Sequence, residues 1–401
     1  NMAQQPLMNT YKRLSVSFER GEGCWLYDTD GNKYLDALSG IAVCGLGHSH
    51  PAVTTAICEQ ASQLIHTSNL YNIPLQEQLA ARLTNISGMD KVFFSNSGAE
   101  ANEAAIKIAR KFGHAKGIEK PSIIVMESSF HGRTMATLSA TGNRAVQAGF
   151  EPLVSGFVRA PFNDAEAIRA IAANNKNIVA ILVEPILGEG GVLIPADDYL
   201  AQLRSICDDN DWLLMLDEVQ TGNGRTGRYF AYQHSYIIPD VVTTAKGLGN
   251  GFPIGACLAK GRAATTFTPG AHGSTFGGSP LACAVGLAVT DTIMNENLCD
   301  RAASLGKRIL DGFKEQLEGM NYVKEIRGKG LMIAIELNEA GTELAILAKV
   351  KGILLNITGS GHVIRLLPPL VMTDTEADLL VNTLSKLIKI YAADERSKPR
   401  S

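Results

Sequence analysis

Leu213-Leu214-Met215-Leu216-Asp217-Glu218 is an unbroken apolar run that ends in two acids. A run of this kind is typical of a strand that is covered on both faces of a sheet. In an open α/β sheet, ligands bind at the carboxyl ends of the strands, where these two carboxylates would lie. Acids at a strand end also cap helices and hold loops. The segment therefore predicts a buried parallel strand, and the role of its acids depends on their surroundings.

Similar apolar runs recur on both sides of this strand and alternate with helical patterns. Further strands are expected at 92–94, 123–126, 178–183, 241–244 and 255–259. The clearest helical pattern covers 99–112. This alternation predicts an α/β fold, with a mostly parallel sheet in a large domain over 76–300. Residues 301–401 are expected to form a smaller α+β domain, which the N-terminal segment 1–75 joins through a hairpin at 25–35.

Composition argues against several classes of function. The 37 basic and 40 acidic side chains give a net charge of −3, so no nucleic acid is expected as a partner. No apolar run approaches the ~20 residues of a membrane span, so no membrane is expected either. The seven cysteines are scattered and form no CxxC pair, which fits free thiols in the cytoplasm. His48 and His50 form an isolated HxH, more typical of a structural turn than of a metal site.

Lys246 lies between the strand at 241–244 and a glycine-rich turn at 247–251. A lysine in this position often only reaches solvent beyond the strand end. In a crowded and partly dry pocket, its pKa would instead fall from about 10.4, and the neutral amine would attack a carbonyl. The segment predicts either a surface lysine or a nucleophile for an aldehyde.

Ser95-Asn96-Ser97-Gly98-Ala99-Glu100 joins a strand to a helix through small residues. Backbone N–H groups and the dipole at such a helix start form a phosphate site. An ordinary N-cap by Ser97 is the simpler alternative. The literal GxGxxG at 222–227 is a weak dinucleotide signal, because no clean helix start follows it, and we interpret it as a loop.

Two more loops bring chemical groups to the same expected edge of the sheet. Phe130, His131 and Arg133 follow the strand at 123–126, and Glu184 and Glu189 follow the strand at 178–183. Together these segments supply a phosphate cradle, a stacking aromatic ring, carboxylates, a lysine and an arginine. Pyridoxal phosphate (PLP) needs this set, because its aldehyde requires a lysine, its ring nitrogen an acid and its phosphate helix N–H groups.

The sequence resembles the class III (subgroup II) PLP-dependent aminotransferases over nearly the whole chain. Seven segments carry the resemblance in order: SNSGAEANEAAIKIAR (95–110), SFHGRTMATLSATG (129–142), VEPILGEGG (183–191), LLMLDEVQTGNGRTG (213–227), TTAKGLGNGFPIGA (243–256), HGSTFGGSPLACA (272–284) and RLLPPL (365–370). The resemblance implies the PLP-dependent transferase fold type I, PLP as cofactor, and a homodimer whose active sites are shared across the interface. Asn223 and Asn250 depart from the residues usual in the family, and we expect altered loop stiffness there rather than altered chemistry.

The resemblance also implies roles for individual residues. Lys246 is expected to bind the cofactor covalently and to move the substrate proton, and Asp217 is expected to pair with the ring nitrogen. Further cofactor contacts are expected from Ser97, Gly98, Ala99, Phe130, His131, Val219 and Gln220, and from Ser274 and Thr275, which would reach the site of the neighbouring subunit. Substrate contacts are expected from Arg133, Arg365, Glu184, Glu189 and Ile41. Glu189 resembles the acid that shields Arg365 when the substrate has no second carboxylate.

Within the class, FERGEG (18–23), LGHSHP (46–51) and LYNIP (70–74) most resemble the members that act on N-acetylornithine. The resemblance implies transfer of the δ-amino group of N2-acetylornithine to 2-oxoglutarate, which gives N-acetylglutamate 5-semialdehyde and glutamate in arginine biosynthesis. Ile41 stands where the ornithine δ-aminotransferases carry a tyrosine that grips the free α-amino end. Succinylornithine, N-succinyl-diaminopimelate and 4-aminobutyrate are alternative donors. Outside the class, the alternatives are an NAD-linked oxidoreductase and a non-catalytic PLP-binding protein.

Overall fold

The computed structural model describes residues 6–397. Its larger lobe is built on a seven-stranded sheet with the order β4-β10-β9-β8-β7-β5-β6. The strands are β4 (Lys91–Ser95), β5 (Ser122–Met126), β6 (Phe157–Ala160), β7 (Ile178–Val183), β8 (Leu213–Asp217), β9 (Val241–Thr244) and β10 (Gly255–Ala259). Only β10 runs antiparallel to its neighbours. The prediction of an α/β fold with a mostly parallel sheet is confirmed.

Helices cover both faces of this sheet, so β5, β7 and β8 at its centre are apolar along almost their whole length. Leu214 and Leu216 of β8 belong to the same buried cluster as α8 (Tyr199–Asn210). Leu213 and Met215, which alternate with them, belong to a second cluster with α4 (Gly98–Ala115). The remaining helices of this lobe are α2 (Pro51–Gln63), α3 (Pro74–Ser87), α5 (Met135–Ala140), α6 (Arg144–Gln147), α7 (Ala165–Asn174) and α9 (Pro280–Asn295). Short 3-10 turns occur at Ala231–Ser235, Lys246–Leu248 and Ala263–Thr265.

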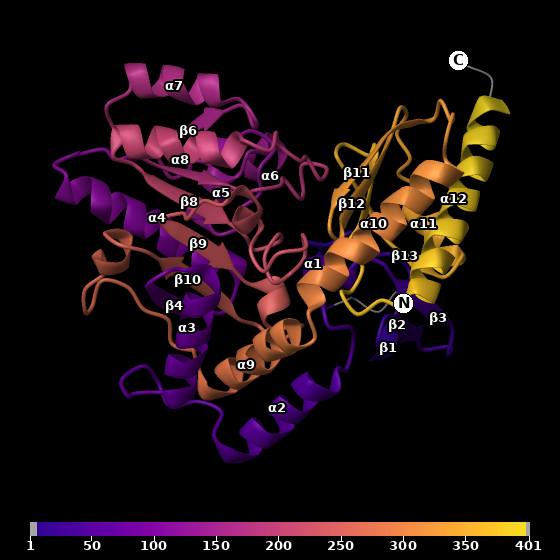
Figure 1. The fold of residues 1–401 in the computed structure, drawn as a ribbon, viewed down its shortest axis with the longest axis horizontal. Coiled ribbons are helices and arrows are strands. Elements are labelled where there is room, and N and C mark those ends of the chain that lie inside the picture. The colour runs from indigo at the N-terminus through magenta and orange to yellow at the C-terminus, as the bar shows by residue number, and fades with distance from the viewer. Residues whose placement is uncertain (1–5, 398–401) are drawn as a thin grey trace.

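Two small sheets and three helices form the second lobe, which stands beside the first in Figure 1. One sheet pairs β11 (Val323–Lys329), β12 (Met332–Leu337), β15 (Val363–Leu366) and β14 (Asn356–Thr358). The other pairs the N-terminal strands β1 (Phe18–Glu22), β2 (Trp25–Asp28) and β3 (Lys33–Asp36) with β13 (Ile353–Leu354). The helices are α10 (Leu298–Gln316), α11 (Leu344–Val350) and α12 (Asp374–Ser397). The domain limits at 75 and 300 stay a prediction.

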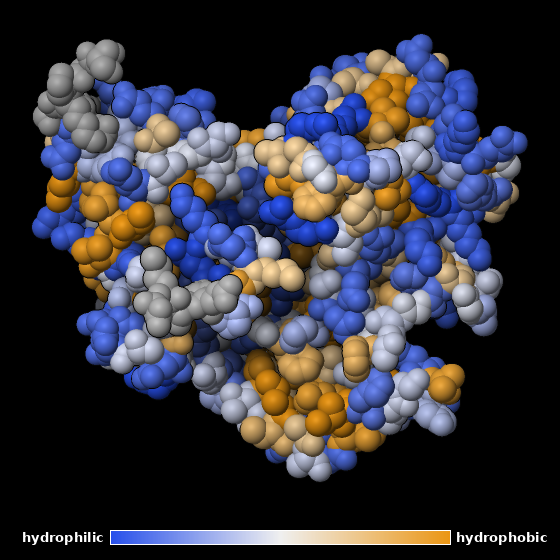
Figure 2. All heavy atoms as spheres, turned by 180° about the vertical axis from the view of Figure 1, so that it is seen from behind, coloured by the Kyte–Doolittle hydropathy of each residue, from blue (hydrophilic) through white to orange (hydrophobic). Residues whose placement is uncertain are grey.

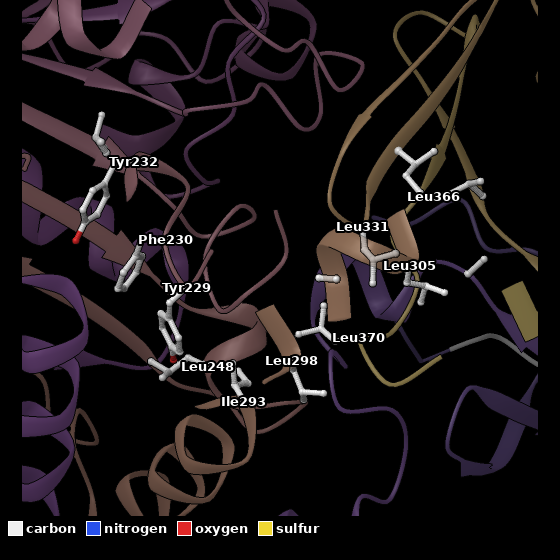
Figure 3. Close-up of a cluster of buried hydrophobic side chains, with 14 of the residues drawn as sticks. Tyr229, Phe230, Tyr232, Leu248, Ile293, Leu298, Leu305, Leu331, Leu366 and Leu370 are labelled. Atoms are coloured by element: carbon white, nitrogen blue, oxygen red, sulfur yellow. The ribbon is translucent and has the colours of Figure 1, made fainter. Parts of the chain in front are cut away.

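The two lobes share a buried apolar cluster. Figure 3 shows Tyr229, Phe230 and Leu248 of the large lobe on one side and Leu331 and Leu370 on the other. The side chain of Arg225 also crosses this junction, because its Nη1 donates to the carbonyls of Leu331 and Pro368. Burial lowers the pKa of Arg225 to about 10, so it keeps its charge at neutral pH. Within residues 6–397, no helix is both long and apolar enough to cross a membrane.

Candidate active site

A cavity of about 420 Å³ opens where β5, β7, β8 and β9 end. Small-molecule sites commonly enclose about 300–1,000 Å³, so a cofactor-sized ligand fits. Of the predicted site residues, Ser97, Gly98, Ala99, Phe130, His131, Arg133, Glu184, Asp217, Val219, Gln220 and Lys246 line it. Figure 2 shows, from behind, that the molecule is hollowed between its two lobes and that hydrophilic residues surround the hollow. The structure thus brings most of the predicted residues together.

The predicted phosphate site lies at the start of α4. The Ser97 hydroxyl accepts a hydrogen bond from the N–H of Glu100 at 3.1 Å, so the N-cap considered as the simpler alternative is present. A cap does not exclude an anion, because the first-turn N–H groups of Gly98 and Ala99 still lie at the positive end of the helix dipole. A Cβ at Gly98 would lie 2.7 Å from a methyl group of Val219, so only glycine lets the helix start approach that side chain.

Asp217 is buried at the end of β8, with each carboxylate oxygen held. Its Oδ1 accepts from the N–H of Val219 at 3.0 Å. Its Oδ2 accepts from Nδ2 of Asn102 at 2.8 Å and lies 2.7 Å from Nδ1 of His131. Donors of this kind fix the orientation of the carboxylate. An acid held in this way suits a cationic ring nitrogen.

Asn102 is a site residue that the sequence analysis missed. It is buried on α4, and its Nδ2 also donates to the carbonyl of His131 at 2.9 Å. Its Oδ1 accepts from the Thr243 hydroxyl of β9 at 2.7 Å. Asn102 therefore connects three segments around Asp217. The only signal in the sequence is a short polar residue on the apolar side of a helix, within the motif SNSGAEAN.

The other two acids near Asp217 have different surroundings. Glu218 points away from the cavity and accepts from the N–H groups of Ala231 and Tyr232 and from the Thr221 hydroxyl. It therefore holds a loop, which was the alternative considered for strand-end acids. Burial and the charge of Asp217 raise the pKa of Glu184 well above its usual range, which favours its protonated form.

Lys246 follows β9 directly and has a positive φ of 41°. Burial lowers the pKa of its amine to about 8, against the opposing effect of nearby acids. A much larger share of the amine is therefore neutral near neutral pH than for an ordinary lysine, as a nucleophile requires. Its Nζ donates to the carbonyl of Ile41 at 3.1 Å. The structure supports a buried nucleophile rather than a surface lysine.

Ile41 belongs to a left-handed turn, Ser39–Ala42, in which four consecutive residues have φ between 55° and 68°. Three of them carry a Cβ, and each such residue costs roughly 1–2 kcal/mol in this conformation. The surrounding structure must supply that energy, and strain of this kind commonly occurs at functional sites. The turn contributes a carbonyl to Lys246, while the Ile41 side chain packs with a small cluster of buried residues that includes Ile186.

Arg365 is fully buried on β15 beside the cavity. Its Nη1 donates to Glu189 Oε1 at 2.8 Å and to Gln220 Oε1 at 3.3 Å, and its Nε donates to Asn356. Its Nη2 is buried without a hydrogen-bond partner among residues 6–397. The structure thus pairs Glu189 with Arg365 and leaves a donor of Arg365 for another ligand. Gln220 reaches the cavity and Arg365 at once.

The remaining predicted residues lie at the rim. Arg133 is exposed, with its guanidinium carbon 5.9 Å from the centre of the Phe130 ring. Ser274 Oγ accepts from Nδ2 of Asn96 at 3.3 Å. Thr275 is exposed and does not line the cavity of its own chain. Its expected role in a neighbouring subunit stays a prediction.

Segments that suggested other chemistry have structural partners. His48 pairs with Asp36 at 2.8 Å, and His50 caps α2 through the N–H of Ala52. Among residues 6–397 there is no group of three or more metal-ligating side chains. The GxGxxG at 222–227 forms successive turns and opens no α-helix. Asn223 donates from that loop to Thr244 Oγ1 at 2.9 Å, close to Lys246.

Comparisons with known proteins agree with this geometry. Residues 7–388 match the model of the class III aminotransferases. The chain belongs to this family. It is 59% identical to the acetylornithine aminotransferase of Nitrosomonas europaea, over 95% of this chain and 97% of the relative. It is 50% identical to acetylornithine aminotransferase 1 of Bordetella bronchiseptica, over 97% of this chain and 99% of the relative.

Solved structures of related enzymes have the same fold. Ornithine aminotransferase from Toxoplasma gondii superposes with a TM-score of 0.94 at 34% identity, over 97% of this chain and 94% of that one. Acetylornithine aminotransferase from Elizabethkingia anophelis superposes with a TM-score of 0.86 at 37% identity, over 96% of both chains. The class III chain thus has the PLP-dependent transferase fold type I, and the oxidoreductase alternative is wrong.

The cofactor of class III aminotransferases is PLP, and a second Toxoplasma gondii structure contains it in the active site. The residues of this chain fit the group. The start of α4 supplies N–H groups for a phosphate, Asp217 supplies a buried carboxylate for a ring nitrogen, and Lys246 supplies an amine of lowered pKa. The roles of the individual residues remain proposals.

Proposed function

We propose that the protein transfers the δ-amino group of N2-acetylornithine to 2-oxoglutarate, giving N-acetylglutamate 5-semialdehyde and glutamate, in arginine biosynthesis. The observation that carries the proposal is the contact of Arg365 with Glu189 at 2.8 Å. An arginine with its own acid can receive either a substrate with one carboxylate or one with two. Ile41, in place of a tyrosine, supports a donor whose α-amine is acylated. The names of the relatives from Nitrosomonas europaea and Bordetella bronchiseptica support the same donor.

Each substrate group has a proposed partner. Arg133, at the rim, binds the carboxylate of the amino donor. Arg365 binds the second carboxylate of 2-oxoglutarate, and Glu189 neutralises Arg365 while the donor is bound. Leaving the guanidinium without a counter-charge inside the protein would cost several kcal/mol. Glu184 supports the loop of Phe130 by accepting its N–H at 2.9 Å.

The proposed chemistry assigns each cofactor-facing residue one task. When bound, PLP supplies an aldehyde for the amino group and a cationic ring that withdraws electrons from the substrate carbon. Lys246 Nζ would take the proton from that carbon and deliver it to the carbon that carries the aldehyde of PLP. Asp217 keeps the ring nitrogen protonated, and the Phe130 ring and Val219 exclude water from the two ring faces. Ser97, Gly98 and Ala99 hold the phosphate.

We also propose a homodimer that acts in the cytoplasm. Figure 2 shows apolar residues gathered at the lower end of the molecule, the end formed by α2, α3 and α9 in Figure 1. Leu64 and Ile65, which directly follow α2, and Leu70 and Tyr71 are exposed apolar side chains. Surfaces of this kind commonly form protein interfaces. The cytoplasmic location rests on the seven cysteines, all of which have free thiols.

A panel of half-reactions tests the donor. The purified protein with bound PLP is mixed separately with N-acetylornithine, N-succinylornithine, N-succinyl-diaminopimelate, 4-aminobutyrate and free ornithine, and the loss of the cofactor absorbance band is timed. The second-order rate constant should be highest for N-acetylornithine. A faster reaction with any other donor would assign that donor instead, and no reaction with any of them would contradict the proposed donor.

A further inference from the structure

The left-handed turn Ser39–Ala42 has no role in the proposed chemistry so far, although it contacts Lys246, the residue at the centre of that chemistry. The carbonyl of Ile41 accepts a hydrogen bond from Lys246 Nζ at 3.1 Å. A run of four left-handed residues is rare, because only Gly40 adopts this conformation without a steric penalty. The position of this carbonyl therefore depends on whatever holds the turn.

Asp36, at the end of β3, stabilises the start of the turn through hydrogen bonds. Its Oδ1 accepts from the N–H groups of Leu38 and Ser39 at 3.0 and 2.8 Å, so it fixes the chain just where the left-handed conformation begins. Its Oδ2 lies 2.8 Å from Nε2 of His48. Burial opposes the charge on His48, but the contacts with Asp36 and Cys44 raise the pKa of His48 to about 9, so Asp36 has a cationic partner.

Two further contacts connect the same segment to both sides of the cavity. The Ser39 hydroxyl donates to the carbonyl of Leu367 at 2.8 Å, two residues beyond Arg365. Asn250, at the end of the loop that starts with Lys246, accepts from the N–H of Leu46 at 2.9 Å and donates to the carbonyl of Gly47 at 3.0 Å. Ile41 is thus fixed relative to the Lys246 loop as well as to β15.

We propose that this turn holds the Lys246 amine in place whenever the amine is not bonded to the cofactor, and that Asp36 is the positioning residue that keeps the turn in shape. The inference rests on the proposed role of Lys246. A carbonyl acceptor binds an ammonium more strongly than a neutral amine, so it opposes the effect of burial on the amine. The charged groups that shift the pKa of Lys246 most are Glu189, Arg365, Asp217 and Glu184, and Asp36 is not among them.

The test uses the full chain freed of PLP and measures the rate of PLP uptake against pH, because only the neutral amine reacts. For wild type, the midpoint of the profile should lie near pH 8. In Asp36→Ala the turn loses its two acceptor contacts and the Ile41 carbonyl moves, so the midpoint should fall by about half a unit or more. Asp36→Asn, which keeps an acceptor oxygen for Leu38 and Ser39, should reverse most of the shift and bring the midpoint back towards the wild-type value.

Asp28 provides a matched control on the neighbouring strand. Its Oδ1 accepts from the N–H groups of Asp30 and Asn32 at 3.0 and 2.8 Å, so it holds a turn in the same way but away from the cavity. Asp28→Ala should keep the wild-type midpoint. If Asp36→Ala fails to fold, Gly40→Ala replaces it. The added methyl group has its nearest atom 3.8 Å away and only makes the left-handed turn more costly, so a smaller shift in the same direction is expected.

Equal midpoints for Asp28→Ala and the Asp36 or Gly40 variant would overturn the inference. Failure of the proposed function is separately visible. Borohydride should fix PLP to the wild-type chain and to both aspartate variants, but not to Lys246→Ala. If wild type is not fixed at Lys246, the role of that lysine is wrong whatever the midpoints are.

Discussion

Asn102 donates a hydrogen bond to Asp217 across 2.8 Å, from the first turns of α4 to the end of β8. The same amide group accepts from Thr243 and donates to the carbonyl of His131, so all of its hydrogen bonds serve the surroundings of one carboxylate. Asn102, on α4, thus helps to orient the carboxylate of Asp217, on β8.

Replacing Asn102 with alanine should lower kcat by roughly 10-fold or more. A hydrogen bond to a charged group is worth about 1.5–3 kcal/mol, and each 1.4 kcal/mol of lost transition-state stabilisation is a factor of ten. Steady-state kinetics with saturating PLP would measure the loss. Asn174→Ala is the control, since that exposed amide donates only to a carbonyl in its own helix. Equal kcat values for the two variants would show that Asp217 needs no such support.

Lys246→Met should change how the stability of the PLP-free chain depends on pH. The pKa of Lys246 falls from 10.5 to about 8 on folding, so between these values the unfolded chain binds more protons than the folded one. The contribution of this lysine to the free energy of unfolding therefore rises with pH across that window and is least favourable below pH 8. Methionine removes it.

Denaturant titrations of both proteins at several pH values measure this difference. The advantage of Lys246→Met over wild type should be largest below pH 8 and should disappear towards pH 10.5. The effect of titrating groups that do not interact with Lys246 cancels, because these groups are common to the two proteins. A difference that does not change with pH would mean that Lys246 has an ordinary pKa in the folded chain.

Glu189→Ala should slow the half-reaction with N-acetylornithine about 10-fold or more and leave the half-reaction with glutamate nearly unchanged. In the first case Arg365 loses its acidic partner Glu189, whereas in the second the substrate supplies a carboxylate. Single-turnover kinetics with each substrate separate the two effects. Glu336→Ala removes an acid that pairs with Arg327 and Lys324 instead, and serves as control. Equal slowing of both half-reactions by Glu189→Ala would contradict the switch.

Thr275→Val and Lys246→Ala chains should complement each other in mixed dimers. If Thr275 serves the site of the neighbouring subunit, each hybrid dimer contains one site with both residues intact. The mixture should then gain activity over either variant alone. Hybrids of Thr266→Val and Lys246→Ala are the control, because Thr266 is bonded within its own turn. Verified hybrids without activity would place Thr275 and Lys246 in the same site.

The sheet was predictable because its strands are buried on both faces. The run Leu213–Leu216 is apolar at every position, and it forms β8 as expected. The short segment at 353–358 has no comparable run, and it divides into β13 and β14. These two pair with different sheets, β13 with β3 and β14 with β15, and no pattern within so short a segment specifies two distant partners.

The parts of the site that the sequence did not reveal depend on contacts over long separations. Asn102 and Asp217 are 115 positions apart, and an asparagine within a helix carries no sign of its partner. The left-handed turn is hidden for another reason. Ser39, Ile41 and Ala42 all disfavour positive φ, so local preference predicts a different backbone. The hydrogen bonds of Ser39 with Asp36, three residues away, and with the distant Leu367 stabilise the observed one.

Arg225 has a consequence for the conditions that the enzyme tolerates. Dissolved ions weaken attraction between charges at the surface, such as Arg308 with Asp378, over distances of about 10 Å at 0.1 M salt. Arg225 lies where ions do not reach, and its guanidinium is bound by uncharged carbonyl oxygens of Leu331 and Pro368. The junction of the two lobes should accordingly withstand high ionic strength, even where the outer surface loses its ion pairs.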